Sequence, residues 1–175
     1  MTYVPRLLDI KTRTAKRSHF LFGPRQTGKS TLIRRELPDA RVYNLLDSRV
    51  FLALNQRPSL LREELVGNDR LVVIDEIQKL PQLLDEVHLC IEEHGQRFLL
   101  TGSSARKLRR GGVNLLGGRA RSLTLHPFLS RELPDFDLIR ALNVGLLPPI
   151  YLSDEPEADL AAYAGTYLRE EIAAE

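Results

Sequence analysis

Short apolar runs alternate with amphipathic segments along most of the chain, and each predicts an element of secondary structure. Five apolar runs predict β-strands, at residues 19–22, 40–45, 70–76, 97–104 and 121–128. The run RLVVIDE at 70–76 is apolar at consecutive positions rather than at alternate ones, which is typical of a strand covered on both faces. Amphipathic segments separate the runs. This alternation of strand and helix predicts an α/β fold, with a parallel sheet between two layers of helices.

The amphipathic segments predict helices of modest length. They lie at residues 6–17, 29–36, 51–65, 81–95 and 104–110. The segment 81–95 is the clearest, because Pro81 stands in its first turn and Gly95 at its C-terminal end, where helices favour these residues. Pro58 interrupts the segment 51–65, which therefore predicts one or two short helices.

Helical patterns without a further strand follow the last apolar run. We expect a core at residues 1–128 and a helical segment at 129–175, the start of a lid or of a linker. The last pattern, at 155–175, has an apolar stripe that includes Leu160 and Tyr163, and it is still running when the sequence ends. We expect this helix to belong with a C-terminal domain of the same protein that lies outside this chain.

Composition excludes several classes of protein. The chain of 175 residues is 43% hydrophobic and 27% charged, which is typical of one compact globular domain. Its net charge of +2 does not by itself indicate nucleic acid binding, although Arg far outnumbers Lys and favours phosphate and carboxylate partners. The single cysteine, Cys90, excludes an internal disulfide framework. No apolar run approaches the ~20 residues of a membrane span, so we expect a cytoplasmic protein without a membrane partner.

The stretch LFGPRQTGKS, directly after the first apolar run, has the spacing of a phosphate-binding P-loop. Its glycines, Gly23 and Gly28, let successive backbone N–H groups face one anion, and the helix that follows adds its dipole. Lys29 can reach the β- and γ-phosphates of a nucleotide, and we expect its side chain to face solvent without a ligand. The residues expected to hold the nucleotide are Gly23, Pro24, Arg25, Gln26, Thr27, Gly28, Lys29, Ser30 and Thr31.

Two carboxylates end the third apolar run, at the edge where parallel sheets bind ligands. We expect Asp75 to hold Mg²⁺ together with the Ser30 hydroxyl. Glu76 has a different expected role, which is to orient and deprotonate the water that attacks the γ-phosphate. The fourth run ends in hydroxyls, and either Thr101 or Ser103 is expected to sense the γ-phosphate.

These three motifs resemble the ATPases associated with diverse cellular activities, the AAA+ class. The resemblance is closest to a bacterial and archaeal group whose ATPase domain precedes a C-terminal domain of unknown function. It rests on FGPRQTGKSTL, VVIDEIQKLPQLL, FLLTGSS and LLGGRARSLTLHPFLSREL, and it extends to GLLPPIY and YAGTYLREEI. It implies a P-loop ATPase core with a five-stranded sheet ordered 5-1-4-3-2, with ATP and Mg²⁺ as cofactors. GLLPPIY departs from that group, which more often has paired glycines there.

Arginines before the fifth strand suggest two further partners. Arg119 or Arg121, on a loop flanked by glycines, is a candidate for an arginine finger that reaches the nucleotide of a neighbouring copy, which requires self-association. The densest basic cluster is Arg106, Lys107, Arg109 and Arg110. It leaves DNA contact open as an alternative to a solvated face, although no aromatic residues for base stacking are interleaved with it.

Three functions are compatible with these residues. The leading hypothesis is a Mg²⁺-dependent ATPase that couples hydrolysis to a conformational change in a partner domain. A small P-loop kinase that phosphorylates a metabolite is the first alternative, since RKLRRGGVNLLGGRAR resembles a mobile arginine lid. A nucleotide-gated switch with slow hydrolysis is the second. Glu76 favours a hydrolase, because a kinase does not need a carboxylate that activates water.

Overall fold

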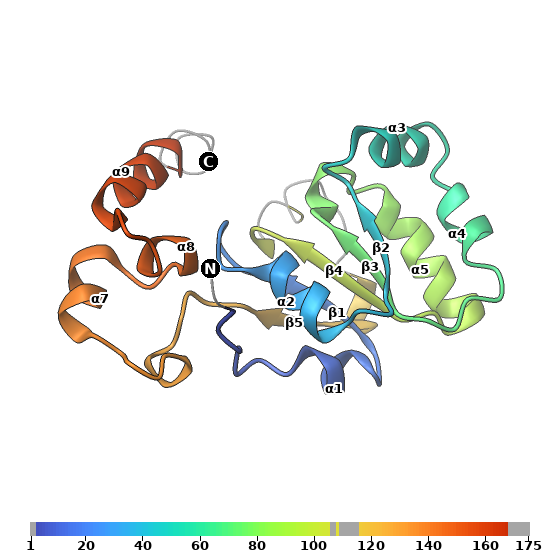
Figure 1. Ribbon diagram of the computed structural model, residues 1–175. Helices are drawn as coiled ribbons and strands as arrows, with labels where there is room; N and C mark the ends of the chain where they lie inside the picture. The colour runs from blue at the N-terminus through green and yellow to red at the C-terminus, as the bar shows by residue number, and fades with distance from the viewer. Residues whose placement is uncertain (1–2, 106–107, 109–115, 168–175) are drawn as a thin grey trace. The chain divides into compact units, whose positions relative to one another are not determined.

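The computed structural model describes residues 3–105, 108 and 116–167 and divides into two compact units (Figure 1). The larger unit spans Leu8–Leu125. The smaller unit combines Met1–Leu7 with His126–Glu175. None of the helices in the described part of the chain is long and apolar enough to cross a membrane.

The larger unit is built around one parallel sheet, as the alternation of elements predicts. Its strands are β1 Ser18–Phe22, β2 Arg41–Asn44, β3 Val72–Asp75, β4 Phe98–Gly102 and β5 Ala120–Thr124. They lie in the order β2-β3-β4-β1-β5, and every neighbouring pair is parallel. The order is the same as 5-1-4-3-2 read from the other edge, so the predicted fold class is confirmed.

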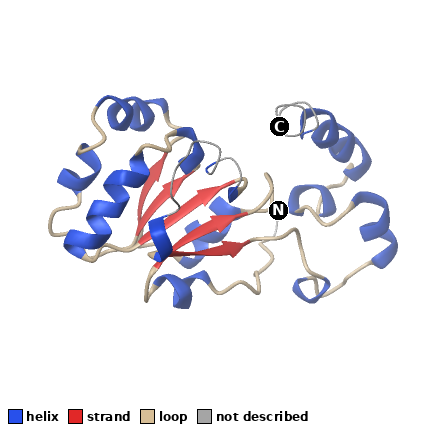
Figure 2. Ribbon diagram, turned by 180° about the vertical axis from the view of Figure 1, so that it is seen from behind, coloured by secondary structure: helices blue, strands red, loops and turns tan. Residues whose placement is uncertain are grey.

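Helices cover both faces of this sheet (Figure 2). Those of the larger unit are α1 Ile10–Thr14, α2 Lys29–Glu36, α3 Ser48–Gln56, α4 Leu60–Glu64 and α5 Leu83–His94. Short 3₁₀ turns follow β3, at η1 Ile77–Lys79, and precede β5, at η2 Leu116–Gly118. Two caps explain where helices begin and end: Asp47 accepts a hydrogen bond from the Arg49 backbone N–H, and Gly95 ends α5 with a φ of 61°.

Successive strand residues pack into different halves of the core, because side chains of a strand alternate between its faces. On one face Phe20, Ile74 and Leu100 pack against helices α3, α4 and α5. On the other face Leu21 and Leu99 pack against α1 and α2. The runs of β1, β3 and β4 therefore mark strands that are buried on both sides, as the sequence predicts for 70–76. The strands at the two edges of the sheet, β2 and β5, are largely exposed.

Several predicted elements are shorter in the structure. The predicted helix at 6–17 is limited to α1, and the predicted strand at 121–128 ends at Thr124, because the chain enters the smaller unit from His126. Two separate helices, α3 and α4, flank Pro58. Most of the predicted helix at 104–110 lies outside the described residues.

The smaller unit has its own apolar centre. Its elements are η3 Ser130–Glu132, α7 Leu138–Val144, α8 Pro148–Tyr151 and α9 Pro156–Tyr167. Phe128 and Tyr151 meet edge to face in this centre, with ring centroids 6.4 Å apart. The first residues of the chain join it through a buried ion pair in which Arg6 Nε donates to Glu132 Oε2 at 2.9 Å. The expected further C-terminal domain stays a prediction.

Candidate functional site

The loop between β1 and α2 is shaped by residues with special backbone conformations. Gln26 and Gly28 have φ angles of 64° and 91°, in the left-handed region. A side chain on Gly23 would collide with the backbone carbonyl of Leu125, so glycine is required there. The Thr27 hydroxyl donates to the Pro24 carbonyl at 2.9 Å and closes the loop from inside. The result is a tight turn that leads directly into the N-terminus of α2, a favourable site for an anion.

Lys29 lies inside this loop rather than in solvent. Its side chain is buried, and Nζ donates to the carbonyls of Gly23 at 2.7 Å and Pro24 at 3.0 Å. The expectation that Lys29 faces solvent is therefore wrong: the loop carbonyls offer the ammonium group hydrogen bonds that compensate for its burial. These two hydrogen bonds hold Nζ against the backbone of the P-loop.

Asp75 ends β3 as the centre of a small hydrogen-bonded group. Ser30 Oγ donates to Asp75 Oδ2 at 3.0 Å, although the two residues are distant in sequence. The Thr101 hydroxyl, at the end of the neighbouring strand β4, donates to Asp75 Oδ1. Asp75 is largely buried, so these bonds take the place of water on its carboxylate.

Glu76 is held in an unusual backbone conformation directly after β3. Its φ of 63° is in the left-handed region, which costs a residue with a side chain roughly 1–2 kcal/mol. Two hydrogen bonds hold it there: its N–H donates to Thr101 Oγ1 at 3.0 Å, and its carbonyl accepts from the Lys79 N–H at 2.9 Å. Thr101 thus connects the backbone of Glu76 to the carboxylate of Asp75.

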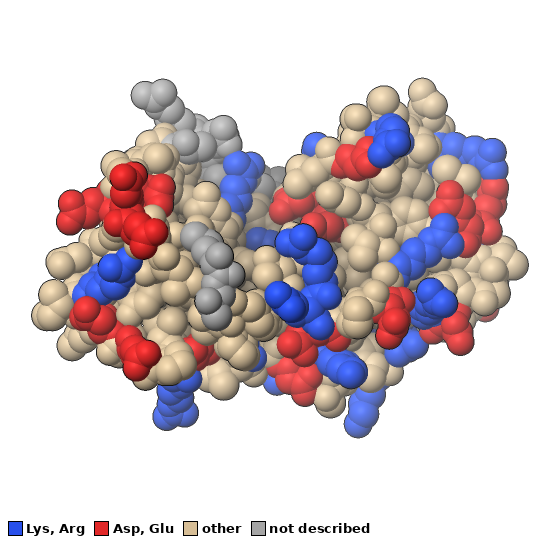
Figure 3. All heavy atoms as spheres, viewed as in Figure 1, with Lys and Arg blue, Asp and Glu red and all other residues tan. Residues whose placement is uncertain are grey.

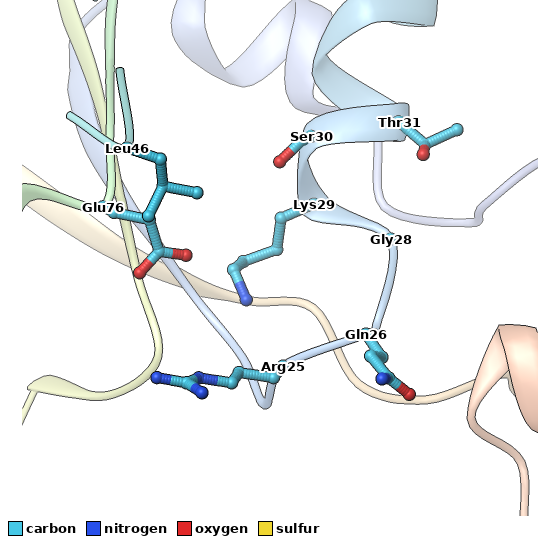
Figure 4. Close-up of a pocket in the computed structure, with 8 residues that line it drawn as sticks. All are labelled: Arg25, Gln26, Gly28, Lys29, Ser30, Thr31, Leu46 and Glu76. Atoms are coloured by element: carbon cyan, nitrogen blue, oxygen red, sulfur yellow. The ribbon is translucent and has the colours of Figure 1, made fainter. Parts of the chain in front are cut away.

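These elements enclose a cavity of about 450 Å³ at the carboxyl edge of the sheet (Figure 4). It is lined by Arg25, Gln26, Gly28, Lys29, Ser30, Thr31, Leu46 and Glu76. In Figure 4 the Glu76 carboxylate faces the cavity from one side and the Lys29 ammonium from the other, with the Arg25 guanidinium below them. Leu46, which follows β2 and is 62% exposed, is a lining residue that the sequence analysis missed, since nothing in its local pattern marks it.

Other predicted residues support the cavity without lining it. Gly23, Pro24 and Thr27 shape the loop from within. Thr101 is fully buried, and it bonds to the Asp75 carboxylate and to the Glu76 backbone N–H. Ser103 follows β4, and its buried Oγ has no hydrogen-bond partner among the described residues.

Arg119 lies at the amino end of the strands, whereas the P-loop lies at their carboxyl end. It precedes β5, whose first residue pairs with Ser18 and whose last pairs with Phe22, next to the loop. In its own chain it forms a partly exposed ion pair with Glu92 of α5, which lowers the pKa of Glu92 through the Arg119 hydrogen bond and charge. Arg121, within β5, is exposed.

The basic cluster of Arg106, Lys107, Arg109 and Arg110 lies outside the described residues. On the face seen in Figure 3, Lys and Arg side chains are interspersed with Asp and Glu. This face therefore adds no support for DNA contact, which stays a prediction.

The donor set around Ser30 and Asp75 suits Mg²⁺. A hydroxyl and a carboxylate oxygen 3.0 Å apart are hard ligands, and Mg²⁺ usually takes one or two protein ligands while phosphates and water supply the rest. Across residues 3–105, 108 and 116–167, no cluster of three or more His, Cys, Asp or Glu forms a metal cage. The site fits a metal that arrives with a phosphate ligand.

The fold and the site together define a class of protein. A parallel sheet in which β1 leads through Gly-x-x-x-x-Gly-Lys-Ser into a helix, beside a strand that ends in Asp-Glu, is the architecture of P-loop nucleotide-binding ATPases. A family model described as AAA domain matches residues 15–134, and the chain belongs to this family.

Comparison with solved structures agrees with this fold. The Orc1 protein of Aeropyrum pernix, solved in complex with DNA, matches with a TM-score of 0.50 and 17% identity over 95% of this chain. The match covers 62% of the Orc1 chain, so this chain spans less than two thirds of that protein. A comparison with curated proteins gave no match. At this identity the likeness concerns the fold alone.

Proposed function

We propose that this protein binds ATP at the P-loop cavity and hydrolyses it with Glu76 as the general base. The observation that carries the proposal is that Glu76 and Lys29 face one cavity from opposite sides, beside the hydrogen-bonded pair Ser30 and Asp75. A phosphate chain at the N-terminus of α2 would bring its terminal group between Lys29 and Glu76.

The P-loop supplies binding and orientation. Backbone N–H groups around Gly28 and the start of α2 face the phosphates, and Lys29 exchanges its loop carbonyls for phosphate oxygens. Ser30 and Asp75 would hold Mg²⁺, which neutralises phosphate charge when it is bound. Thr101 keeps the Asp75 carboxylate oriented from behind through its hydroxyl.

Glu76 supplies the step that distinguishes hydrolysis from transfer. Its carboxylate accepts a proton from a water molecule while the oxygen of that water attacks the γ-phosphorus. The bond between the γ-phosphorus and the bridging oxygen breaks, and ADP leaves with the electron pair. A positioned general base typically contributes about 10²–10⁴ in rate.

A P-loop kinase is the alternative for the same cavity, and Glu76 argues against it. A kinase must exclude water from the γ-phosphate, whereas a carboxylate that lines the cavity supports activation of water. Coupling of turnover to motion in a partner domain is a further part of the proposal, and DNA contact, as in the Orc1 complex, is another.

The test compares the wild type with Glu76→Gln and Asp75→Asn. Phosphate release is measured without any added acceptor, and nucleotide affinity is measured by calorimetry with Mg²⁺ and with a chelator. We expect Glu76→Gln to keep ATP affinity and to lose roughly 10²-fold or more in turnover. Asp75→Asn should weaken ATP binding only when Mg²⁺ is present. Asp85→Asn, an exposed carboxylate on α5, is the matched control and should change neither quantity.

Two outcomes would contradict the proposal. If both variants release phosphate at the wild-type rate, the two carboxylates do not act on the nucleotide. If the wild type binds ATP but releases phosphate only when a small-molecule acceptor is present, the protein is a kinase.

A further inference from the structure

Gln78, which the proposed mechanism does not use, contacts the carboxylate of Glu76. It lies in the 3₁₀ turn η1, two residues after Glu76, and its side-chain Nε2 donates to Glu76 Oε2. A carboxylate is an acceptor only, so the amide nitrogen must be the atom that faces it. This bond occupies one carboxylate oxygen and leaves the second for the cavity that Glu76 lines.

The other end of the Gln78 amide lies against the sheet. Its Oε1 is buried without a hydrogen-bond partner among the described residues. It lies against Gly102 at the end of β4, so closely that a Cβ at that position would be 2.7 Å from it. A buried amide oxygen without a partner is costly, which indicates that the amide is held here for its contact with Glu76.

We propose that Gln78 is a positioning residue for ATP hydrolysis, which holds the Glu76 carboxylate in the orientation that accepts a proton from water. The left-handed backbone of Glu76 fixes where its side chain begins, and the bond from Gln78 fixes where the side chain ends. A long carboxylate side chain without that bond samples several rotamers, only some of which face the γ-phosphate. The inference rests on the proposed function and assigns a residue that supports its general base.

Gln78→Met tests this directly, because methionine keeps the length of the side chain and removes the donor. We expect kcat to fall roughly tenfold or more while KM and ATP affinity stay within about twofold, since the lost contact acts on the chemical step. Gln78→Asn keeps an amide on a shorter side chain and should recover part of the lost rate. Gln82→Met is the matched control: Gln82 bonds to Asn55 on the surface and should have wild-type kinetics.

Gly102→Ala perturbs the same contact from the other side. The added methyl group meets the far end of a flexible side chain, so it should displace the Gln78 amide without disrupting the strand. We expect it to lower kcat in the wild-type background. In a Gln78→Ala background it should have no further effect, because no amide remains to be displaced.

The outcomes separate this inference from the proposed function. Wild-type kcat in Gln78→Met, with Glu76→Gln inactive, overturns the role of Gln78 and leaves the proposed function intact. A raised kcat in Gln78→Met also overturns it, because Gln78 would then restrain Glu76. A change confined to KM means that Gln78 acts on binding instead. If Glu76→Gln itself hydrolyses at the wild-type rate, the proposed function fails first.

Discussion

Backbone conformation does as much as side-chain chemistry to form this site. Gln26, Gly28 and Glu76 all have positive φ angles, and all three line one cavity. For Gln26 and Glu76 this conformation costs free energy that glycine would not pay, and such strain persists only where the surroundings hold it. At Glu76 the surroundings are two backbone hydrogen bonds, to Thr101 and from Lys79. Both strained residues therefore line the cavity.

Lys29→Ala is expected to weaken ATP binding by roughly 10- to 100-fold, the usual range for losing a charge-assisted hydrogen bond. The methylene stem of Lys29 is buried, so the thermal midpoint of unfolding should also fall slightly. Calorimetric titration with ATP gives the affinity. Lys79→Ala is the matched control, because Lys79 is exposed and lies over the Phe51 ring. Equal ATP affinity in the wild type and Lys29→Ala would show that this loop does not bind the phosphates.

Residues in a local motif are predictable from the sequence, whereas several of the contacts that these residues make in the fold are not. The spacing of Gly23, Gly28 and Lys29 predicts a phosphate loop because all of the required groups lie within one turn. The contacts of Lys29 with loop carbonyls depend on how the loop closes, which spacing does not specify. The sequence predicts either Thr101 or Ser103 as a sensor of the γ-phosphate, but the bond from Thr101 to Asp75 depends on the pairing of β3 with β4.

At the scale of elements, the apolar pattern predicts the order of strands and helices along the chain. It does not predict where several of these strands and helices end. The strands β1, β3 and β4 are buried at every position, so their apolar runs stand out against the amphipathic helices. The apolar pattern continues past Thr124 because Leu125 and Phe128 are both buried, in different units. The local pattern of apolar residues is the same whether a strand continues or the chain enters a second apolar centre, so it does not show where β5 ends.

His19 in β1 should make the stability of the larger unit depend on pH. Burial lowers the pKa of His19 from its ordinary 6.5, and the charges of Arg121, Arg13 and Arg17 lower it further, against a hydrogen bond with the Arg17 carbonyl. Below pH 6.5 the unfolded chain takes up a proton that the folded chain does not. The free energy of unfolding therefore decreases as the pH is lowered. The slope is at most about 1.4 kcal/mol per pH unit for one proton.

Urea unfolding of the wild type and His19→Gln between pH 7.5 and pH 5, roughly the range over which histidines titrate, isolates this contribution. We expect the wild type to lose more stability than His19→Gln across this range. His94→Gln, at an exposed position, should retain the wild-type dependence. Parallel curves for the wild type and His19→Gln would contradict the prediction.

At the scale of the whole molecule, the first residues of the chain belong to the smaller unit. Arg6 donates to Glu132 and to the carbonyls of His126 and Pro127, and the second Glu132 oxygen accepts from the Leu7 N–H at 2.7 Å. These partners are far apart in sequence, and Arg6 in isolation resembles any basic residue near a terminus. No local pattern could have predicted the pairing.

Glu132→Ala is expected to destabilise the smaller unit by about 3–5 kcal/mol, because it removes the carboxylate that forms a buried ion pair with the Arg6 guanidinium. Hydrogen exchange measures this locally, at the Phe128 N–H, which donates to the Leu146 carbonyl. Exchange there should become much faster than in the wild type. The neighbouring Arg131→Ala, at an exposed position, should exchange at the wild-type rate. Unchanged protection in Glu132→Ala would mean that the ion pair does not stabilise the unit.

Arg119 is expected to act as an arginine finger between copies of the protein. Arg119 is separated from the P-loop of its own chain by the length of β5, on the order of 15 Å, so it can reach a γ-phosphate only in a neighbour. An arginine finger is worth about 10³–10⁵ in rate, and partial assembly would therefore be visible. Specific activity should rise with protein concentration in the wild type and stay low in Arg119→Ala.

A mixing experiment makes the test independent of concentration. Arg119→Ala lacks the finger but keeps Glu76, and Glu76→Gln lacks the general base but keeps Arg119. Each variant alone should therefore be nearly inactive. When the two are mixed, neighbours that combine the Glu76 of one chain with the Arg119 of the other should recover part of the wild-type rate. Activity that is flat across the dilution series, with no recovery on mixing, would mean that Arg119 serves only its ion pair with Glu92.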